Sequence, residues 1–491
     1  MMRRYRIGRV EGHWKNFLPP IQGGVFRPRG VDGDGSCLNA GGSSVSSHAS
    51  SRSPSPPALF DGGEGLRGRR GQVGTDGKRK VSISSASSTS SVEEKEVRTD
   101  GMAHLDSLTK SEIKLDLEKY PSLDQATQDA IVQKYRSLNE RIKAEGLFNC
   151  NYSAYAVECC RYTLFFGLML LFLRWGWYGT SGFFLGAFWH QLVFSAHDAG
   201  HMGITHDFHI DTVIGIVIAD FLGGLSLGWW KHNHNVHHVV TNSPERDPDI
   251  EHMPLFAISH RFLGSLRSTY YERVMHYDAA AKLLISVQHY TYYFLLLFGR
   301  FNLYRLSWEF LIGGKGPKRG PAWWHRYLEI LGNLVFWGWF GYGICYRSID
   351  TNWHRFVFIM VSHMVTAPLH VQITLSHFAM STADLGVDES FPQKMLRTTM
   401  DVDCPEWLDF FHGGLQFQAI HHLYPRIPRH NLRRTQKLVQ EFCDEVGVPY
   451  GLYGFADGNK VVIGRLAEVA RQATILKKCQ SVLATEGIHR H

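Results

Sequence analysis

The sequence predicts an all-α integral membrane protein, in which two transmembrane helical hairpins and several interfacial helices support a cytosolic helical cap that holds a metal site. Three histidine clusters carry this prediction: HDAGH at 197–201, HNVHH at 234–238 and QAIHH at 418–422. Each cluster lies beside a long apolar stretch. A bilayer core requires roughly 20 helical residues, and four of the apolar stretches reach or nearly reach that length.

The first part of the chain is polar, and no chemistry is expected there. Residues 31–100 are rich in Ser, Gly and Arg, so they cannot offset the entropy of ordering and are predicted to be a disordered low-complexity linker. Residues 101–148 are predicted to be a helical lead-in, because their apolar residues recur at spacings of three and four. Pro121 divides it into two helices, the second capped by Ser122 or Asp124.

The membrane domain is predicted at residues 149–450, followed by a C-terminal tail at 451–491. The expected membrane spans are 162–178, 182–196, 328–346 and 356–375. Two further segments, 212–230 and 282–298, are apolar enough to suggest spans as well. If all three clusters reach one site, however, the chain crosses the membrane an even number of times between each pair of clusters. Both further segments are therefore assigned to the interface, or to a dip into the membrane and back.

The spacing of the histidines favours metal binding. Positions i, i+3 and i+4 share one face of a helix, so the histidines of each cluster point the same way. A tetrahedral zinc ion takes four ligands, so these seven histidines fit two metal ions better than one. His377 emerges from the last expected span on the same side and is an eighth candidate. The cluster histidines are His197, His201, His234, His237, His238, His421 and His422.

Charge and cysteine content bear on the binding partners and on the cellular compartment. The formal net charge of +7 is modest and does not indicate a nucleic-acid partner. Four arginines after the third cluster either meet anionic lipid head groups or form a solvated helix face. These are Arg426, Arg429, Arg433 and Arg434. The eight cysteines show no CxxC pair, which favours a reducing compartment, and the basic N-terminus lacks the apolar run of a secretory signal.

The order HxxxH, HxxHH and QxxHH resembles the membrane front-end fatty acyl and sphingolipid desaturases, which carry three histidine boxes. The runs WWKHNHNVHHVVTN and LDFFHGGLQFQAIHHLYPRIPRHNLRR are most similar to those of fungal delta-8 sphingolipid desaturases. The N-terminal run RIGRVEGHWKNFLPPIQGG shares this similarity. The resemblance covers about residues 150–450 and implies a double bond placed in the long-chain base of ceramide.

The resemblance also implies the cofactors. In that family the box histidines and the isolated histidine, here His377, bind two iron ions, so the cap would hold a di-iron site. Gln418 is a ninth candidate, which would bind a metal directly, hold a water or orient a neighbouring ligand. The co-substrate would be O2, and electrons would come from cytochrome b5 and an NADH-dependent reductase. The expected location is the endoplasmic reticulum membrane, with the boxes on the cytosolic side.

The chain departs from these relatives at its N-terminus. They commonly carry a fused cytochrome b5 domain with an HPGG haem loop, which this sequence lacks. Residues 1–30 resemble the remnant of the segment that follows such a domain. Two explanations are open, a truncated chain or reliance on a separate cytochrome b5, and truncation is favoured.

Other activities remain open at this stage. A front-end fatty acyl desaturase of the delta-5 or delta-6 type or a lipid hydroxylase would use the same boxes. A membrane zinc hydrolase acting on ceramide would need one metal ion, and the surplus of histidines argues against it.

Overall fold

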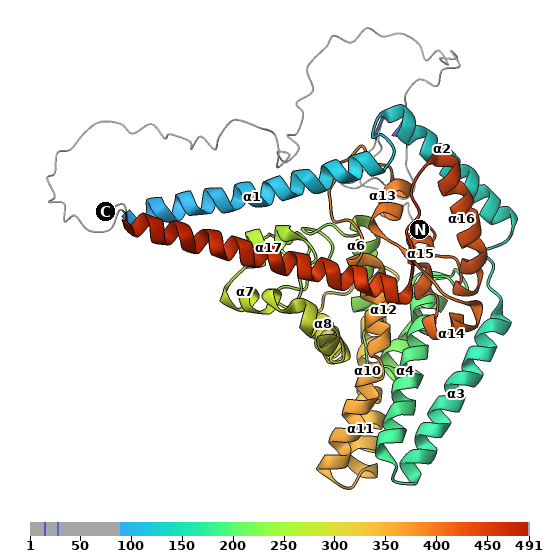
Figure 1. The fold of residues 1–491 in the computed structure, drawn as a ribbon. Coiled ribbons are helices and arrows are strands. Elements are labelled where there is room, and N and C mark those ends of the chain that lie inside the picture. Colours follow the sequence, from blue (N-terminus) through green and yellow to red (C-terminus); the bar gives the residue numbers. More distant parts are fainter. Residues whose placement is uncertain (1–13, 16–26, 29–88, 490–491) are drawn as a thin grey trace, which may run out of the picture. The chain divides into compact units, whose positions relative to one another are not determined.

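The computed structural model describes residues 14–15, 27–28 and 89–489, and the side chains of residues 102–478. The described part is predominantly helical, as the sequence predicts (Figure 1). Most of residues 1–30 and 31–100 lie outside the described residues, apart from strands β1 (Trp14–Lys15) and β2 (Arg27–Pro28) and the start of the first helix. The remainder of this description concerns the compact unit that includes Glu93–His491.

The helical lead-in consists of α1 (Thr89–Lys119) and α2 (Gln125–Ala144). The predicted break at Pro121 is confirmed, and Asp124 caps α2 by accepting a hydrogen bond of 3.0 Å from the Thr127 amide. Helix α1 begins at Thr89, within the segment expected to be the linker, 31–100.

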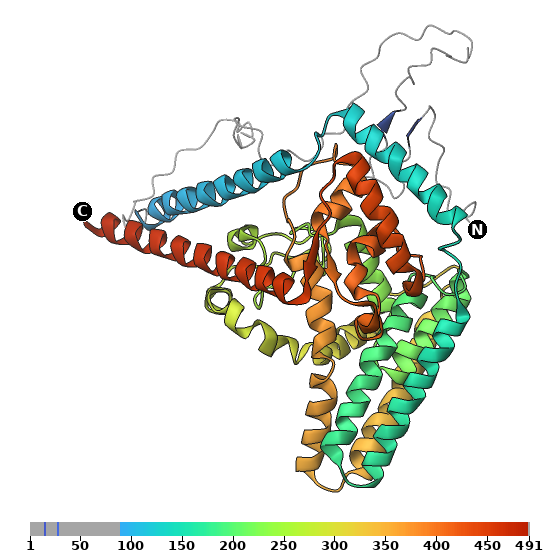
Figure 2. The same ribbon diagram turned by 45° about the vertical axis from the view of Figure 1, so that its right-hand side comes forward.

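The helices expected in the membrane lie side by side in both views (Figures 1 and 2). They are α3 (Tyr152–Arg174), α4 (Tyr178–Gly200), α10 (His325–Phe336) with η4 (Trp337–Ser348), and α11 (Asn352–Met364) with α12 (Ala367–Phe378). By length and apolar composition, α3 and the pair α11–α12 are able to cross a membrane. Helix α4 packs against both α3 and α11. Neither α4 nor α10–η4 meets the same measure, so the full pair of hairpins stays a prediction.

The segment that leads to the second histidine cluster is sharply bent. Helix α5 (Phe208–Ile216) continues into η2 (Val217–Leu222), and α6 (Leu227–Val240) then leaves at 118°. The buried Asp220 carboxylate accepts a hydrogen bond from the Leu227 amide at 3.2 Å. A second buried carboxylate, that of Glu329, accepts one from the Gly228 amide at 2.9 Å. The two acids therefore cap α6. By length and composition the bent segment is compatible either with a broken membrane span or with a re-entrant loop, so its expected return stays a prediction.

The segment 282–298 forms two short helices followed by a third. These are α7 (Ala279–Ser286), α8 (Gln288–Leu296) and α9 (Gly299–Ile312), preceded by the short helix η3 (His260–Gly264). Neither α7 nor α8 has the length of a membrane span. Tyr290 and Phe294 on α8 are 80% and 60% exposed, as interfacial aromatic residues would be.

Short elements form the cap over the bundle. They are α13 (Phe391–Thr398), β3 (Asp401–Asp403), η5 (Glu406–Leu408), α14 (Asp409–His412), η6 (Leu415–Phe417), α15 (Gln418–Leu423), η7 (Arg429–Asn431), α16 (Leu432–Val446) and β4 (Leu452–Gly454). Strands β3 and β4 pair in parallel. An apolar core joins α2 to α13, α15 and α16, so the lead-in is part of the cap.

The predicted C-terminal tail is a structural helix, α17 (Phe455–His489). Val462, Leu466 and Val469 of this helix are buried in a core that also contains residues of α8 and α12. Arg465 of α17 forms an ion pair of 3.3 Å with Glu112 of α1. Helix α17, which lies beyond the boundary expected at residue 450, thus packs against the helices that support the site.

Candidate metal centre

Four helix ends position the candidate ligands. His197 and His201 lie at the C-terminal end of α4, one turn apart. The second cluster occupies the last two turns of α6, and the third lies on the short helix α15. His377 is near the end of α12. The predicted helical placement of all three clusters is confirmed, and the four helices bring these histidines together.

The ligand atoms of the histidines form two groups. In the four-histidine group, the ligand atoms of His197, His201, His234 and His421 all lie within 4.8 Å of one another. In the three-histidine group, the same holds for His237, His377 and His422. Each group draws on three different helices. A third possible group, His234, His237 and Asp249, shares a member with each of these two. The arrangement thus offers more than one candidate position for a metal ion.

His238 lies between the two groups. Its Nε2 atom is 3.1 Å from Nε2 of His234 and 3.1 Å from Nε2 of His421, both in the four-histidine group. Its ring stacks on that of His422 with centroids 4.2 Å apart. His238 is therefore placed to contact either metal position or both.

Several ring nitrogens in the centre are buried without a hydrogen-bond partner. They are Nε2 of His201, Nδ1 of His238, Nδ1 of His377 and Nε2 of His422. Buried polar atoms are nearly always hydrogen-bonded, and imidazole nitrogen is a good ligand for iron, copper and zinc. These unpaired nitrogens therefore fit a metal centre.

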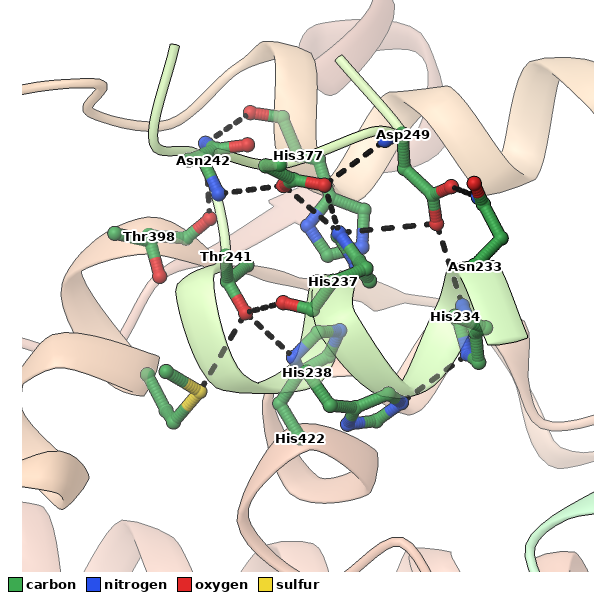
Figure 3. Close-up of polar contacts among 12 residues, drawn as sticks. Asn233, His234, His237, His238, Thr241, Asn242, Asp249, His377, Thr398 and His422 are labelled. Carbon is green, nitrogen blue, oxygen red and sulfur yellow. Dashed lines mark hydrogen bonds and ion pairs between the residues drawn. The ribbon is translucent and has the colours of Figure 1, made fainter. Parts of the chain in front are cut away.

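Two carboxylates that the sequence analysis missed orient the second cluster (Figure 3). Both oxygens of the fully buried Asp247 lie within 2.9 Å of Nδ1 of His237, and an oxygen of Asp249 lies 3.3 Å from Nδ1 of His234. Because a carboxylate only accepts, the His237 proton is held on Nδ1 and Nε2 is left for a metal. The sequence DPD at 247–249, shortly after a histidine box, was the signal that could have revealed them.

The end of α6 is tied to its neighbours in the same way (Figure 3). The Thr241 hydroxyl donates to the His237 carbonyl at 2.7 Å, so its oxygen accepts from Nδ1 of His422, 3.2 Å away. This leaves Nε2 of His422 free for a metal. The Asn242 side chain donates to the His377 carbonyl at 2.8 Å and so joins α6 to α12.

Burial sets the charge of these rings. It lowers the pKa values of His238, His421 and His422 well below the usual range, and their histidine neighbours lower them further. These imidazoles are therefore neutral, the form that binds metals. Burial also lowers the pKa of His237, but Asp247 and Asp249 outweigh it and hold that pKa at about 8. A metal at His237 replaces a proton that those carboxylates otherwise stabilise.

Gln418 is buried at the first position of α15, one turn before His421 and His422. The buried Asp401 carboxylate caps this helix by accepting from the Ala419 amide at 2.8 Å. Asp401 also accepts from Gln436 on α16 at 2.8 Å, so α15 is held in place from outside the metal centre.

Three of the four arginines after the third cluster form ion pairs with acidic residues of the same chain. Arg429 is buried and bridges Glu158 of α3 and Asp198 of the first cluster. Arg433 pairs with Asp409 at 2.5 Å, and Arg434 pairs with Glu145 at 2.8 Å. Arg429 is therefore part of a buried ion-pair network, whereas Arg434, whose side chain is 47% exposed, pairs on a solvated helix face.

Comparison with known proteins agrees with this centre. Residues 173–454 match the family model for fatty acid desaturases. A Delta 8-(E)-sphingolipid desaturase of Emericella nidulans is 62% identical over 487 residues, which cover 99% of this chain and 86% of the relative. The chain belongs to the fatty acid desaturase family. A Delta 8-(E)-sphingolipid desaturase of Kluyveromyces lactis is 47% identical over 98% of this chain and 84% of the relative. An acyl-lipid (9-3)-desaturase of Borago officinalis is 38% identical over 63% of this chain and 68% of the relative.

Family membership makes this desaturase an oxidoreductase that acts on lipid chains in a membrane. It excludes the alternative of a zinc hydrolase. The resemblance seen in the histidine boxes is confirmed, and the matched region contains all eight candidate histidines and Gln418.

Proposed function

We propose that this desaturase introduces a double bond at the delta-8 position of the long-chain base of ceramide. The relatives that match it over nearly its whole length are named for delta-8 sphingolipid desaturation, and they come from several fungi. The observation that carries the proposal is the pairing of this match with two complete histidine groups in one buried centre.

The residues present fit two iron ions. His197, His201, His234 and His421 would hold one, and His237, His377 and His422 the other. His238 would complete one shell or bridge both, and Gln418 is proposed as a ninth ligand or as a group that orients one. Iron supplies, with dioxygen, the oxidising power that removal of hydrogen from an unactivated methylene pair requires.

The overall reaction is balanced by an external donor. Two C–H bonds of adjacent methylenes break and a carbon–carbon π bond forms, while O2 is reduced to two waters. The substrate supplies two of the four electrons, and a cytochrome b5 with its NADH-dependent reductase supplies the other two together with two protons from solvent. The chain's own part is to hold eight imidazoles in one largely buried site. Three of them, His237, His234 and His422, are oriented by Asp247, Asp249 and Thr241.

The proposed setting is the endoplasmic reticulum membrane, with the histidine boxes on the cytosolic side. Helices α3 and α4 would form one hairpin, and α10–η4 and α11–α12 the other. Both histidine-bearing helices of the bundle, α4 and α12, end at the metal centre, which the even number of crossings requires.

Expression in a yeast that lacks delta-8 unsaturated bases, with and without added cytochrome b5, tests the proposal. New delta-8 unsaturated long-chain bases, found by mass spectrometry of hydrolysed sphingolipids, are expected. New polyunsaturated fatty acids would instead assign the acyl activity of the Borago officinalis relatives, and hydroxylated bases would assign a lipid hydroxylase. Absence of all these products, with cytochrome b5 present and iron bound, would overturn the proposal.

A further inference from the structure

Two adjacent cysteines stand on the outer face of α3. Among the cysteines whose side chains the structure describes, Cys159 and Cys160 alone are exposed, and both are free thiols. They lie near the end of α3 that meets the cap, since Glu158 beside them pairs with Arg429 of the cap. Residues 162–173 then continue the helix without a charged side chain. The two thiols are thus at the junction between the cap and the apolar part of a helix that is able to cross a membrane.

A shallow groove begins at these thiols and follows α3 away from the cap. Its volume is about 610 Å3, and it is lined by the two thiols and by Thr163, Leu164, Gly167, Leu168 and Leu171. A Cβ atom added at Gly167 would meet nothing within 4 Å, so no neighbouring helix fills the groove there. The Thr163 hydroxyl donates to the Cys159 carbonyl at 2.8 Å, so its proton is not presented to the groove. The groove is therefore a mainly apolar surface with a pair of thiols at one end.

The position of the thiols and the length of the groove both suit an acyl chain. Cysteines next to a membrane helix are the usual positions of reversible S-acylation. From Cys160 to Leu171 the groove follows about 16 Å of helix, at 1.5 Å per residue. An extended chain advances about 1.2 Å per bond, so about 14 carbon atoms cover that length. The groove is therefore long enough to hold most of a long-chain acyl group.

We propose that the Cys159–Cys160 pair is an S-acylation site and that the attached chain lies in this groove. The acyl donor is a long-chain acyl-coenzyme A, used by a membrane acyltransferase. The cysteine sulfur attacks the thioester carbonyl carbon, a new C–S bond forms, and the bond from that carbon to coenzyme A breaks. Coenzyme A leaves as a thiol with the proton that the cysteine loses, so no oxidant or reductant is needed. The donor is cytosolic, so this inference relies on the proposed cytosolic side of the cap.

An attached chain fits the groove better than a second copy of this protein does. Contacts between membrane helices favour small residues, which let the backbones approach closely. Leu164, Leu168 and Leu171 line this groove, and the side chains of Leu164 and Leu171 are 57% and 41% exposed. A single acyl chain can lie along these side chains, whereas they would hold the backbone of a second helix away.

An anchor at this position would support the first histidine cluster. Only 11% of the apolar window of α3 is buried, so this helix has little support from the rest of the bundle. The same helix contacts the first cluster, because the Tyr155 hydroxyl donates to the Asp198 carboxylate at 2.5 Å. Glu158 of α3 pairs with Arg429, which also pairs with Asp198. An acyl chain in the groove covers part of the exposed face of α3 and thereby fixes a helix that contacts the metal centre.

The test measures thioesters on the full-length chain expressed in yeast. Free thiols are blocked with N-ethylmaleimide, thioesters are cleaved with neutral hydroxylamine, and the released thiols are labelled with a maleimide polymer that shifts the band on a gel. The double variant Cys159→Ala and Cys160→Ala removes both thiols and introduces a good helix former. Cys404→Ala is the control, because Cys404 lies in the cap, only partly exposed, beside Arg433. Mass spectrometry of the intact protein identifies the acyl chain.

Wild-type protein is expected to carry the hydroxylamine-dependent label, the double variant to lose it, and Cys404→Ala to keep it. If the double variant does not accumulate, Cys159→Ser with Cys160→Ser makes the same comparison. Absence of the label from wild-type protein, or a label that persists in the double variant, would overturn the proposal. Free thiols at Cys159 and Cys160 that form a disulfide between two chains on mild oxidation would assign the groove to an interface between copies and would also overturn it.

Gly167→Leu tests whether the chain lies in the groove. The new side chain fills the groove and leaves both thiols in place. Gly338→Leu is the matched control, because a Cβ atom at Gly338 of η4 would likewise meet nothing within 4 Å. After a pulse of labelled palmitate, the label should be lost several-fold faster from Gly167→Leu, because a displaced chain exposes its thioester to thioesterases. Equal rates of loss in the two variants would overturn the placement of the chain.

The failure of this proposal and that of the proposed function can be told apart, because the thioester label does not depend on desaturation. Delta-8 products from a wild-type chain without the label overturn the S-acylation site alone. A label on Cys159 or Cys160 in a chain that makes no delta-8 product overturns the proposed function alone.

Discussion

The four-histidine group and the three-histidine group differ in how firmly the chain around them holds their ligands. The side chains of His197 and His234 are 21% and 13% exposed, and the contact between His234 and Asp249 is long, at 3.3 Å. In the three-histidine group, His237 is 1% exposed and lies 2.8 Å from a wholly buried Asp247. The three-histidine group is thus more deeply buried and more closely supported, while the four-histidine group is closer to solvent.

The difference also concerns the helices that bring the ligands. The three-histidine group joins the ends of α6, α12 and α15, which Thr241 and Asn242 tie together within the centre. The four-histidine group depends on α4, whose position is set by the ion pair of Asp198 with Arg429. A site can therefore be complete in its ligands and still differ in rigidity from one metal position to the other.

The largest effect is expected from loss of a ligand. His237→Ala and His197→Ala should each abolish desaturation, because each removes a ligand from one of the two iron positions in the proposed site. The metal content should fall by one ion per chain in each variant, measured by elemental analysis of purified protein. His232→Ala is the control, since His232 is exposed on the same helix α6 and bonds to Tyr270. Full activity in His237→Ala would contradict the assignment of ligands.

Arg429→Met is expected to have the next largest effect, on stability. It leaves the buried Asp198 carboxylate and the partly buried Glu158 carboxylate without their arginine; loss of one partner of a buried ion pair typically costs about 3–5 kcal/mol. A lower Tm in detergent and loss of metal first from the four-histidine group should follow. Arg434→Met is the control, because its ion pair with Glu145 is exposed, and it should leave the Tm unchanged. An unchanged Tm in Arg429→Met would show that this ion pair does not hold α4.

Asp247→Asn and Asp249→Asn compare the two groups directly. Loss of a carboxylate behind a metal-binding histidine typically lowers metal affinity or activity by about 10–100-fold. Asp247→Asn should reach that range, because Asp247 also accepts from the Asn242 amide and is fully buried. Asp249→Asn should lose less, because its contact with His234 is longer. Iron titration of both purified variants measures which of them loses more affinity. A larger loss in Asp249→Asn would mean that burial of the carboxylate does not decide how firmly its histidine is held.

Thr241→Val should have the smallest effect, an activity loss of about fivefold, equivalent to the roughly 1 kcal/mol of one hydrogen bond. Its hydroxyl holds Nδ1 of His422, so the variant loosens one ligand of the three-histidine group without removing it. Thr435→Val is the matched control, because the Thr435 hydroxyl of α16 likewise donates to the carbonyl four residues before it, that of Asn431, and Thr435 contacts none of the candidate ligands. The desaturation rate is measured as product formed in yeast. Equal rates in both variants would show that the Thr241–His422 hydrogen bond is not needed for activity.

Much of the site could be predicted from local sequence. The spacing of His234, His237 and His238 places them on one helical face whatever the rest of the fold does, and counting membrane crossings joined His377 to the boxes. The carboxylates that orient these ligands could not be predicted in the same way. Asp247 and Asp249 act through a loop that folds back onto α6, and loops carry no periodic signal that fixes where their side chains point.

The long-range partners of Arg429 and of α17 could not be predicted from the sequence either. An arginine near a membrane domain has the same local pattern whether it faces lipid or pairs with acids from two distant helices. The helical character of residues 455–489 was missed because a tail was expected, yet Val462 and Leu466 are fully buried. Both corrections come from contacts between residues far apart in the chain.

The sequence by itself determined which residues are the candidate metal ligands and which family the protein belongs to, because helical spacing and box order are local properties. Only the tertiary structure decided how the histidines divide between two groups, that His238 lies between them, and which carboxylates orient them. These features depend on the packing angles of α4, α6, α12 and α15. Such angles are set by the complementarity of whole helix surfaces, which no single segment of sequence contains.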